Sequence, residues 1–164
     1  MSKAIEVQAP NKLVKHDGYV SVFLAGSIEM GKAIDFQRMI IEASNHVPYI
    51  FYNPRRDDWD SSWEPVKENE KFREQVEWEL DALEAADVIL MYFDPKTISP
   101  ISLLELGIFS HKHKMIICCP KGYFRKGNID IVCERYGIPQ VDTLEELVSI
   151  FANGEVDDLY ITNE

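Results

Sequence analysis

Two glutamates, Glu105 and Glu79, carry side chains that could act as nucleophiles or as acids and bases. Ser102 and Glu105 have the spacing of a capping box, in which the serine caps a helix and the glutamate reaches back to the cap residue. A carboxylate in the first turn of a helix also lies near the positive end of the helix dipole, which favours its ionised form. The pattern therefore predicts that Glu105 is either a helix cap or an ionised, nucleophilic carboxylate.

Glu79 falls on the apolar stripe of a predicted helix, three residues after Val76 and four before Leu83. A carboxylate among apolar side chains needs either a partner or a function. An ion pair with an arginine such as Arg55 would supply the partner, and a ligand site would supply the function. Gln75, four residues earlier on the same face, would extend the polar patch in either case.

A segment rich in aspartate and tryptophan offers a second kind of chemistry. Its aspartates include Asp58 and Asp60, which are interleaved with Trp59 and Trp63. Acids beside flat apolar rings suit a nucleobase that must be both stacked and protonated. A solvated turn with one buried tryptophan explains the same residues, so both interpretations stay open.

The elements that position these residues follow from the apolar pattern. Buried strands are predicted over Val20–Ala25, Tyr49–Tyr52, Val88–Phe93 and Met115–Cys119. Helices are predicted over Asp35–Ser44, Val66–Ala85, Ser102–Ser110 and Thr143–Phe151. Strands that are apolar on both faces and alternate with helices predict an α/β fold, with a parallel sheet covered on each side.

Ligands bind beyond the carboxyl ends of the strands in such a sheet, so the segments that follow the strands are the candidate site. They are Gly26–Ser27, Asn53–Ser62 and Asp94–Ser102. Glycine at the first of these turns would let a ligand approach the backbone closely, although a plain turn has the same composition. The turn has neither the lysine of a phosphate-binding loop nor the glycine pattern of a dinucleotide site.

Composition and charge predict one compact domain without a nucleic-acid polymer as partner. The chain has 164 residues, 46% of them apolar, and a net charge of -11, which repels phosphates. No apolar run suits a signal peptide or a membrane span, so we expect a cytoplasmic protein with no membrane partner. We expect an extension over residues 1–18, a domain over residues 19–153 and an acidic tail over residues 154–164.

Cysteine and histidine usage argues against disulfides and metals. Cys118, Cys119 and Cys133 are odd in number, and two of them lie in a predicted buried strand, so free thiols are expected. His111 and His113 lie in a polar turn among lysines, which favours a solvated surface over a metal site.

Four blocks follow one another along the chain: FLAGSI, NPRRDDWD, EQVEWELDALEAADVILMYF and SPISLLELG. With these blocks, the stretch from Tyr19 to about Phe151 resembles the nucleoside 2-deoxyribosyltransferase-like family. The resemblance implies a flavodoxin-like three-layer sandwich with a central parallel sheet of about five strands. It also implies a homo-oligomer whose active sites borrow residues from a neighbouring subunit.

The resemblance implies roles for particular residues. Glu105 matches the family's nucleophilic glutamate, and Glu79 falls where the better-known transferases place a site aspartate. Gly26 and Ser27 correspond to the turn that faces the ligand. Asn128 resembles a residue that reaches the 5' end of the sugar across a subunit interface. The other substrate-binding positions that we expect are Asn53, Trp59, Asp60, Gln75 and Ser102.

The implied reaction is a retaining double displacement at the anomeric carbon of a 2'-deoxynucleoside. Glu105 would attack as the base departs, and an incoming free base would then attack the 2-deoxyribosyl-enzyme. Departure requires protonation of the base or hydrogen bonding to it, for which Asp58 and Asp60 are candidates. The reaction needs no metal and no organic cofactor.

Two other functions remain consistent with the sequence. One is a hydrolase that uses water as the acceptor, possible on deoxynucleoside 5'-monophosphates if Arg125, Lys126 or Arg55 holds the phosphate. The other is a nucleotide-sensing module that binds the ligand tightly and releases no base.

Overall fold

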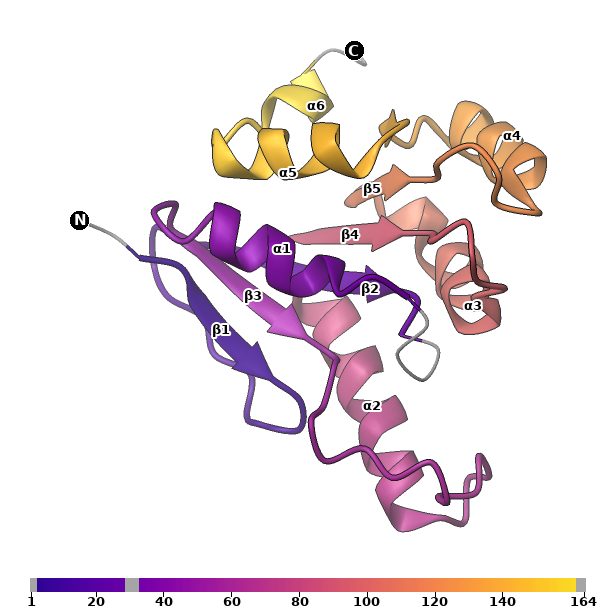
Figure 1. Ribbon diagram of the computed structural model, residues 1–164. Coiled ribbons are helices and arrows are strands. Elements are labelled where there is room, and N and C mark those ends of the chain that lie inside the picture. Colours follow the sequence, from indigo (N-terminus) through magenta and orange to yellow (C-terminus); the bar gives the residue numbers. More distant parts are fainter. Residues whose placement is uncertain (1–2, 29–32, 162–164) are drawn as a thin grey trace.

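Six parallel strands form one sheet at the centre of the fold (Figure 1). The computed structural model describes residues 3–28 and 33–161 of the chain. The strands are β1 (Ile5–Gln8), β2 (Val20–Gly26), β3 (Tyr49–Asn53), β4 (Val88–Tyr92), β5 (Met115–Cys118) and β6 (Gln140–Val141). Their order across the sheet is β1-β3-β2-β4-β5-β6, and each neighbouring pair is parallel.

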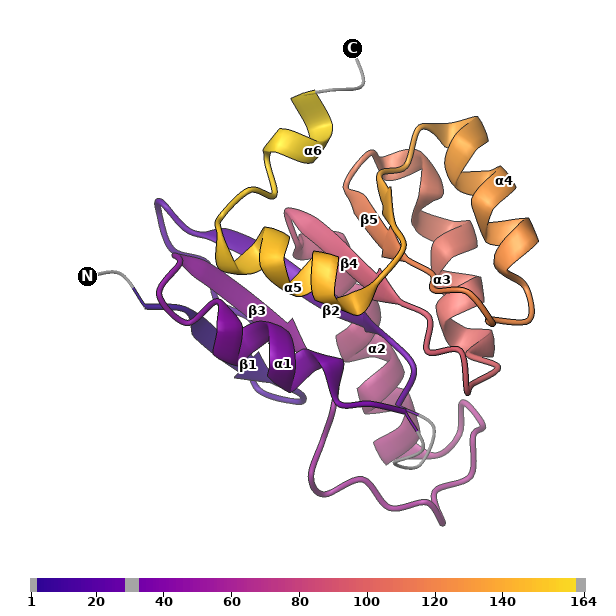
Figure 2. The same cartoon turned by 45° about the horizontal axis from the view of Figure 1, so that its top comes forward.

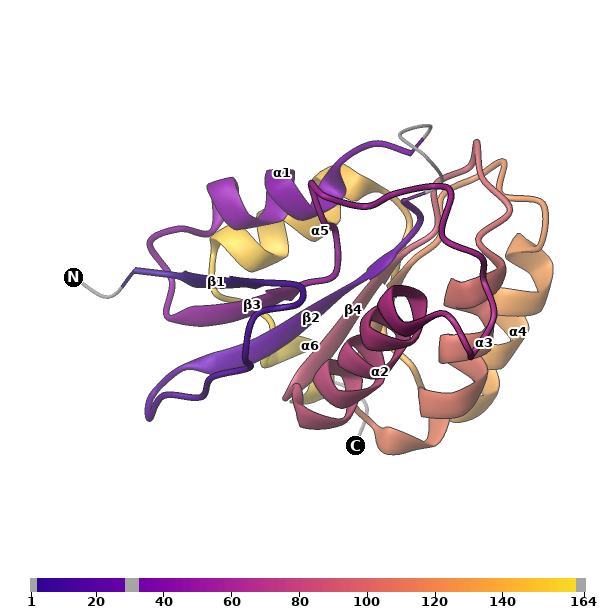
Figure 3. The same ribbon diagram turned by 90° about the horizontal axis from the view of Figure 1, so that it is seen from below.

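Helices lie on both faces of the sheet. They are α1 (Phe36–Ala43), α2 (Glu70–Ala85), α3 (Pro100–Phe109), α4 (Lys126–Tyr136), α5 (Leu144–Ala152) and α6 (Asp158–Ile161), with a 3-10 turn, η2, over Ser110–Lys112. Figure 3 shows α1 and α5 on one face and α2, α3 and α4 on the other. The predicted flavodoxin-like three-layer sandwich is therefore confirmed, with six strands in place of about five.

Two apolar clusters hold the three layers together. Alternation along β2 sends Phe23 into the cluster beneath α2, α3 and α4, and Leu24 into the cluster beneath α1 and α5. Both side chains are at most 1% exposed. A strand that is apolar on both faces is thus buried on both faces, as its sequence predicts.

Within the segment 1–18 that the sequence suggests as an extension, residues 5–8 form the edge strand of the sheet. β1 pairs with β3 from Ile5 opposite Ile50 to Gln8 opposite Asn53. With only four residues, β1 carries too little alternation to separate it from a loop in the sequence. β6 went unpredicted for the same reason, because it has only two residues.

Helix boundaries follow the caps. α2 begins at Glu70 and not at Val66, because the Asn69 side chain accepts a hydrogen bond from the backbone N–H of Phe72 at 3.0 Å. The predicted cap of α5 is confirmed, since Thr143 Oγ1 accepts from the backbone N–H of Glu146 at 3.2 Å. α4 was not predicted, because it buries few apolar side chains and most of its surface faces solvent.

The three cysteines are free and buried, as expected. Burial raises the pKa of the Cys118 thiol to about 12, so it stays protonated at neutral pH. Within the two described ranges, no helix is long and apolar enough to cross a membrane.

Candidate active site

The helices that follow β2 and β4 in the chain, α1 and α3, lie on opposite faces of the sheet (Figure 2). β2 and β4 are neighbours, and Gly26 at the end of β2 lies opposite Tyr92 at the end of β4. A crevice for a ligand is expected at such a switch point in an α/β sheet.

Gly26 is required by the packing at this point. A Cβ atom at residue 26 would lie 2.6 Å from the backbone oxygen of Tyr92 and 2.6 Å from a ring carbon of Phe36. Neither neighbour can move away cheaply, since one is backbone in a sheet and the other is a buried ring. The glycine therefore has a structural role, whether or not a ligand also approaches it.

Three buried hydroxyls join the two loops at the switch point. Ser27 Oγ forms hydrogen bonds with Thr97 Oγ1, at 2.7 Å, and with Ser99 Oγ. Thr97 Oγ1 and Ser99 Oγ are themselves 2.7 Å apart. The loop before α3 is thereby fixed to the end of β2, and α3 starts from a defined position.

The prediction of a capping box at Ser102 and Glu105 is wrong. α3 begins two residues earlier, at Pro100, whose fixed φ and missing N–H suit the first position of a helix. Ser102 is inside the first turn and Glu105 is in the second, and both side chains are buried. Glu105 points into the protein at 8% exposure instead of reaching back to the end of the helix.

The environment of Glu105 favours the protonated acid, which is the opposite of the ionised form expected from a helix dipole. Burial raises the pKa of Glu105 to about 8, and the nearby charge of Glu79 contributes to the same increase. A carboxyl at this position holds its proton at neutral pH until a substrate or a neighbour removes it.

Glu79 on α2 is the second carboxyl of the site. Burial raises its pKa to about 7, although a hydrogen bond from Gln75 opposes the increase. The Nε2 atom of Gln75 lies 3.4 Å from Glu79 Oε1. Arg55 pairs with Asp35 at 3.1 Å, so the alternative in which Arg55 neutralises Glu79 is wrong.

We call Glu105 and Glu79 the carboxyl pair. The two side chains come from α3 and α2, which lie side by side on one face of the sheet (Figure 3). In the part of the chain that the structure describes, no lysine or arginine forms an ion pair with either residue. Two neighbouring carboxyls shielded from water, of which one raises the pKa of the other, tend to share one proton near neutral pH.

The turn after β3 is tied to α2. Asn53 is buried, and its Oδ1 accepts from the backbone N–H of Arg55 at 3.0 Å. Gln75 donates from Nε2 to the carbonyl oxygen of Pro54 at 2.9 Å. Asn53 and Gln75, both expected in the site, are thus joined through this turn to Glu79.

Beyond this turn, the acidic segment is organised by Arg56. The Arg56 side chain is 2% exposed and donates to both carboxylate oxygens of Asp58, each at 2.9 Å. This bond lowers the pKa of Asp58, and a bond from Ser62 lowers that of Asp60. Both aspartates are therefore ionised at neutral pH and poorly suited to donate a proton in this conformation.

Trp59 and Trp63 form an edge-to-face pair with ring centroids 4.8 Å apart. Trp59 is 39% exposed, so one aromatic ring remains accessible on this segment. Figure 1 shows the connection between β3 and α2 extending past the carboxyl ends of the strands. The segment therefore offers one accessible aromatic ring for stacking.

A family model described as "Nucleoside 2-deoxyribosyltransferase like" matches residues 19–123, which is more than half of the chain. The chain belongs to the nucleoside 2-deoxyribosyltransferase-like family. The match spans β2 to β5 and includes both members of the carboxyl pair. A search of curated protein sequences gives no match.

The match ends before α4, where Asn128 lies in the first turn with an exposed side chain. The role of Asn128 at the 5' end of the sugar, across a subunit interface, stays a prediction. Lys126 is engaged within the chain, because its Nζ donates to the Cys119 carbonyl and to Asp130, both at 3.0 Å. Arg125 lies against Phe124, with its guanidinium 5.4 Å from the ring centroid.

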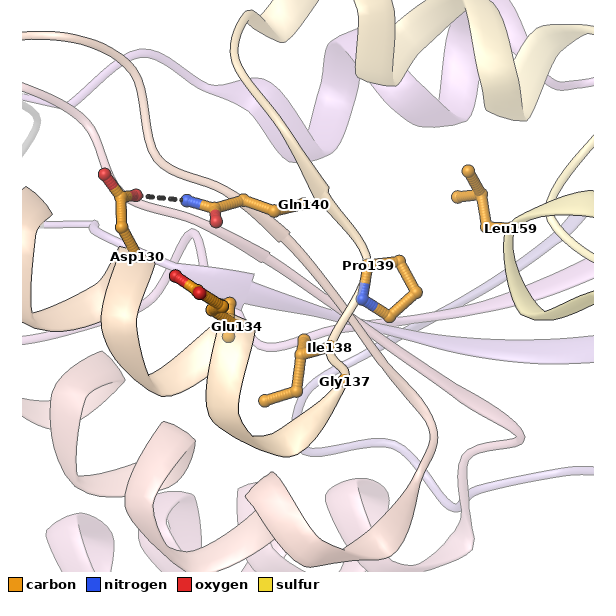
Figure 4. A pocket seen from close by; sticks show the side chains of 8 residues that line it. Asp130, Glu134, Gly137, Ile138, Pro139, Gln140 and Leu159 are labelled. Atoms are coloured by element: carbon orange, nitrogen blue, oxygen red, sulfur yellow. Dashed lines mark hydrogen bonds between the residues drawn. The ribbon is translucent and has the colours of Figure 1, made fainter. Parts of the chain in front are cut away.

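A hollow of about 560 Å³ lies away from these residues, beside α4, the start of β6 and α6 (Figure 4). Asp130 and Gln140 form a hydrogen bond of 2.6 Å on its wall. The hollow is at the amino end of β6, whereas ligands of α/β sheets bind at the carboxyl ends. None of the residues predicted for the site lines it.

Sequence reasoning missed Glu6, Thr97 and Ser99, which all contact predicted site residues. Glu6 lies in the short strand β1 and accepts a hydrogen bond from Asn53 at 3.1 Å. No local pattern marks such a long-range contact. The hydroxyls of Thr97 and Ser99 lie in a segment that the sequence did single out, but only the fold shows that Ser27 binds them.

Proposed function

We propose that this chain transfers a 2-deoxyribosyl group between nucleobases, with Glu105 as the nucleophile. Membership of the family indicates a glycosyl-transferring enzyme, with nucleosides and nucleobases as its substrates. The observation that carries the finer proposal is the carboxyl pair, in which Glu105 is buried and Glu79 is half-buried. The pair lacks a cationic partner in the described ranges, and the raised pKa values favour a bound proton near neutral pH.

The pair supplies both groups that the first step needs. The C1'–N bond breaks, its electron pair goes to the nitrogen of the base, and the proton of the pair moves to the departing base. Glu79 takes this proton from Glu105 and passes it to the departing base, so Glu105 becomes ionised and its oxygen forms the new bond to C1'. Glu79 is the member that we assign to the proton, because Asp58 is held in its ionised form by Arg56.

The second step reverses these movements with a different base. The acceptor nitrogen attacks C1' from the face that the first base vacated, and the C1'–O bond to Glu105 breaks. The proton of the acceptor nitrogen returns to the carboxyl pair. Two inversions at the same carbon retain the configuration of the sugar.

We further propose that the active unit is a homo-oligomer. Ile101, Leu104 and Ile108 recur at helical spacing on the outer side of α3 and are 59%, 59% and 48% exposed. Phe124, in the loop before α4, is 57% exposed as well. A second copy of the chain would remove this apolar surface from water.

The experiment that tests the transfer incubates the purified protein with each 2'-deoxynucleoside, and with its 5'-monophosphate, in the presence and absence of a second free base. A new deoxynucleoside that forms only when the second base is present supports the proposal. Free base without an exchange product would indicate the hydrolase. Ligand binding without turnover would indicate the sensing module.

A further inference from the structure

Residues 3–18 precede the family match, yet they contact the elements that carry the candidate site. Trp78, next to Glu79 on α2, donates from Nε1 to the carbonyl oxygen of Asn11 at 2.8 Å. Gln8 at the end of β1 donates from Nε2 to the carbonyl oxygen of Arg55 at 2.8 Å. The segment therefore holds both α2 and the turn after β3.

Glu6 is the charged residue of this segment that bonds directly to a predicted site residue. Its Oε2 accepts from Asn53 Nδ2 at 3.1 Å. Both of its carboxylate oxygens also accept from Arg38 Nη2 of α1, at 3.1 and 3.0 Å. The side chain of Glu6 is 25% exposed, so most of it is shielded from water.

Asn53 connects Glu6 to the turn after β3 through the two hydrogen bonds of its side-chain amide. While Nδ2 is held by Glu6, Oδ1 accepts from the backbone N–H of Arg55 at 3.0 Å. Between them lies Pro54, whose carbonyl oxygen accepts from Gln75 at 2.9 Å. The Pro54 carbonyl and the Arg55 N–H belong to one peptide group, so the Asn53 amide that holds this N–H also sets the position of the carbonyl.

Gln75 connects the turn to the carboxyl pair. Its Nε2 has two hydrogens and lies within reach of both the Pro54 carbonyl and Glu79 Oε1, at 2.9 and 3.4 Å. Its Oε1 accepts from Arg56 at 3.4 Å. A shift of the Pro54 carbonyl would turn the amide and change its bond to Glu79.

We propose that Glu6 is a positioning residue for the carboxyl pair and acts on Glu79 through Asn53 and Gln75. Its effect on catalysis rests on the proposed function, whereas its effect on Glu79 does not. Glu6 lies on the edge strand, with β3 between it and β2, and acts only through other residues. The segment before the family match is thus part of the scaffold of the site.

Three single variants and one double variant of the full chain separate this role from a general contribution to the fold. Glu6→Leu removes both acceptors, and Glu6→Gln keeps an oxygen for the Asn53 amide. Arg38→Met removes the ion pair of Glu6 but leaves its bond to Asn53. If Glu6→Leu does not fold, the test is repeated with the Glu6→Leu/Arg38→Met double variant, in which neither charge of the ion pair remains. The reference protein for the double variant is then Arg38→Met.

The readout is the titration of the Glu79 carboxyl, followed by NMR with labelled glutamate side chains. The bond from Gln75 favours ionised Glu79, so its loss raises the midpoint. We expect Glu6→Leu to raise the midpoint by about half a pH unit or more, Glu6→Gln to restore it and Arg38→Met to leave it in place. The titration of Glu105, the carboxyl of α3 whose pKa the charge of Glu79 raises, is followed in the same spectra.

Two results overturn the inference: a Glu79 titration that is the same in folded Glu6→Leu as in wild type, or an equal shift in Arg38→Met. In kinetic assays we expect Glu6→Leu to lower kcat/KM about tenfold, with partial recovery in Glu6→Gln. If wild type is inactive on every deoxynucleoside while the titration shifts as expected, the proposed function fails and the positioning role stands.

Discussion

Glu105 and Glu79 have pKa values of about 8 and about 7, both well above the ordinary value of a glutamate. Burial is the larger cause for each, and the charge of Glu79 adds to the increase at Glu105. Holding such carboxyls in a folded protein has a cost in stability at high pH. A functional site is one setting in which proteins retain them.

Glu105→Gln separates function from stability. We expect kcat to fall by at least about a thousandfold, because the amide cannot form the sugar ester. The folded state binds the Glu105 proton more tightly than the unfolded state, so the stability of wild type falls as the pH rises from about 4.5 to about 8. The glutamine side chain does not titrate, so the stability of the variant does not fall in this way. At pH 8 we expect its free energy of unfolding to exceed that of wild type by about 2 kcal/mol or more.

Urea unfolding at pH 5 and pH 8 measures this difference. Glu68→Gln, at an exposed position before α2, is the matched control and should show no such dependence. If Glu105→Gln unfolds at lower urea concentration than wild type at both pH values, the result contradicts the prediction that burial raises the pKa of Glu105.

Glu79→Gln tests the coupling within the carboxyl pair. Removal of the Glu79 charge lowers the pKa of Glu105, so the Glu105 carboxyl should titrate at lower pH by NMR. We expect kcat to fall by about 10²- to 10⁴-fold, and by less for deoxynucleosides whose base departs readily without a proton. An unaltered Glu105 titration would show that the two carboxyls are not coupled.

The residues themselves were largely visible in the sequence, but their states were not. The sequence pattern alone indicates both Glu105 and Glu79 as candidate site residues. The helix begins at Pro100, earlier than the sequence pattern predicts, and Glu105 therefore faces the interior. Burial there raises the pKa of Glu105, so the protonated acid is favoured over the ionised form that the sequence predicts. The ion pair between Asp58 and Arg56 could not be predicted either, because no spacing rule indicates that the Arg56 side chain is buried and binds Asp58.

At the scale of elements, close packing at the end of β2 fixes the geometry of the switch point. Gly26→Ala should destabilise the protein by about 2 kcal/mol or more, because the added methyl meets the Tyr92 carbonyl and the Phe36 ring at 2.6 Å. Gly127→Ala on α4 is the control, since nothing lies within 4 Å of its added methyl. Thermal unfolding of both variants checks this, and equal stabilities would contradict it.

Long elements with strong periodicity were predicted, and short or edge elements were not. The four buried strands and the helices between them follow from apolar runs and caps that local residues determine. β1 and β6 depend on pairing with distant strands, which a local pattern does not encode. The contact of Glu6 with Asn53 spans 47 positions in sequence and appears only when β1 is placed beside β3.

At the scale of the whole molecule, the helix that carries Glu105 presents apolar side chains to solvent. Leu104→Glu places a charge in the middle of the proposed interface and should shift the protein to a smaller species in sedimentation experiments. Val66→Glu, in the loop before α2, is the control and should leave the assembly intact. A wild-type protein that sediments as a monomer at all concentrations contradicts the proposed oligomer.

The central claim is that Glu105 forms a covalent bond to the sugar. The most direct measurement is intact-protein and peptide mass spectrometry after acid quenching of the enzyme with a 2'-deoxynucleoside and no acceptor base. The account predicts one added 2-deoxyribosyl group, located on the peptide that contains Glu105 and absent from Glu105→Gln. Base exchange without any adduct, or an adduct on another residue, would contradict it.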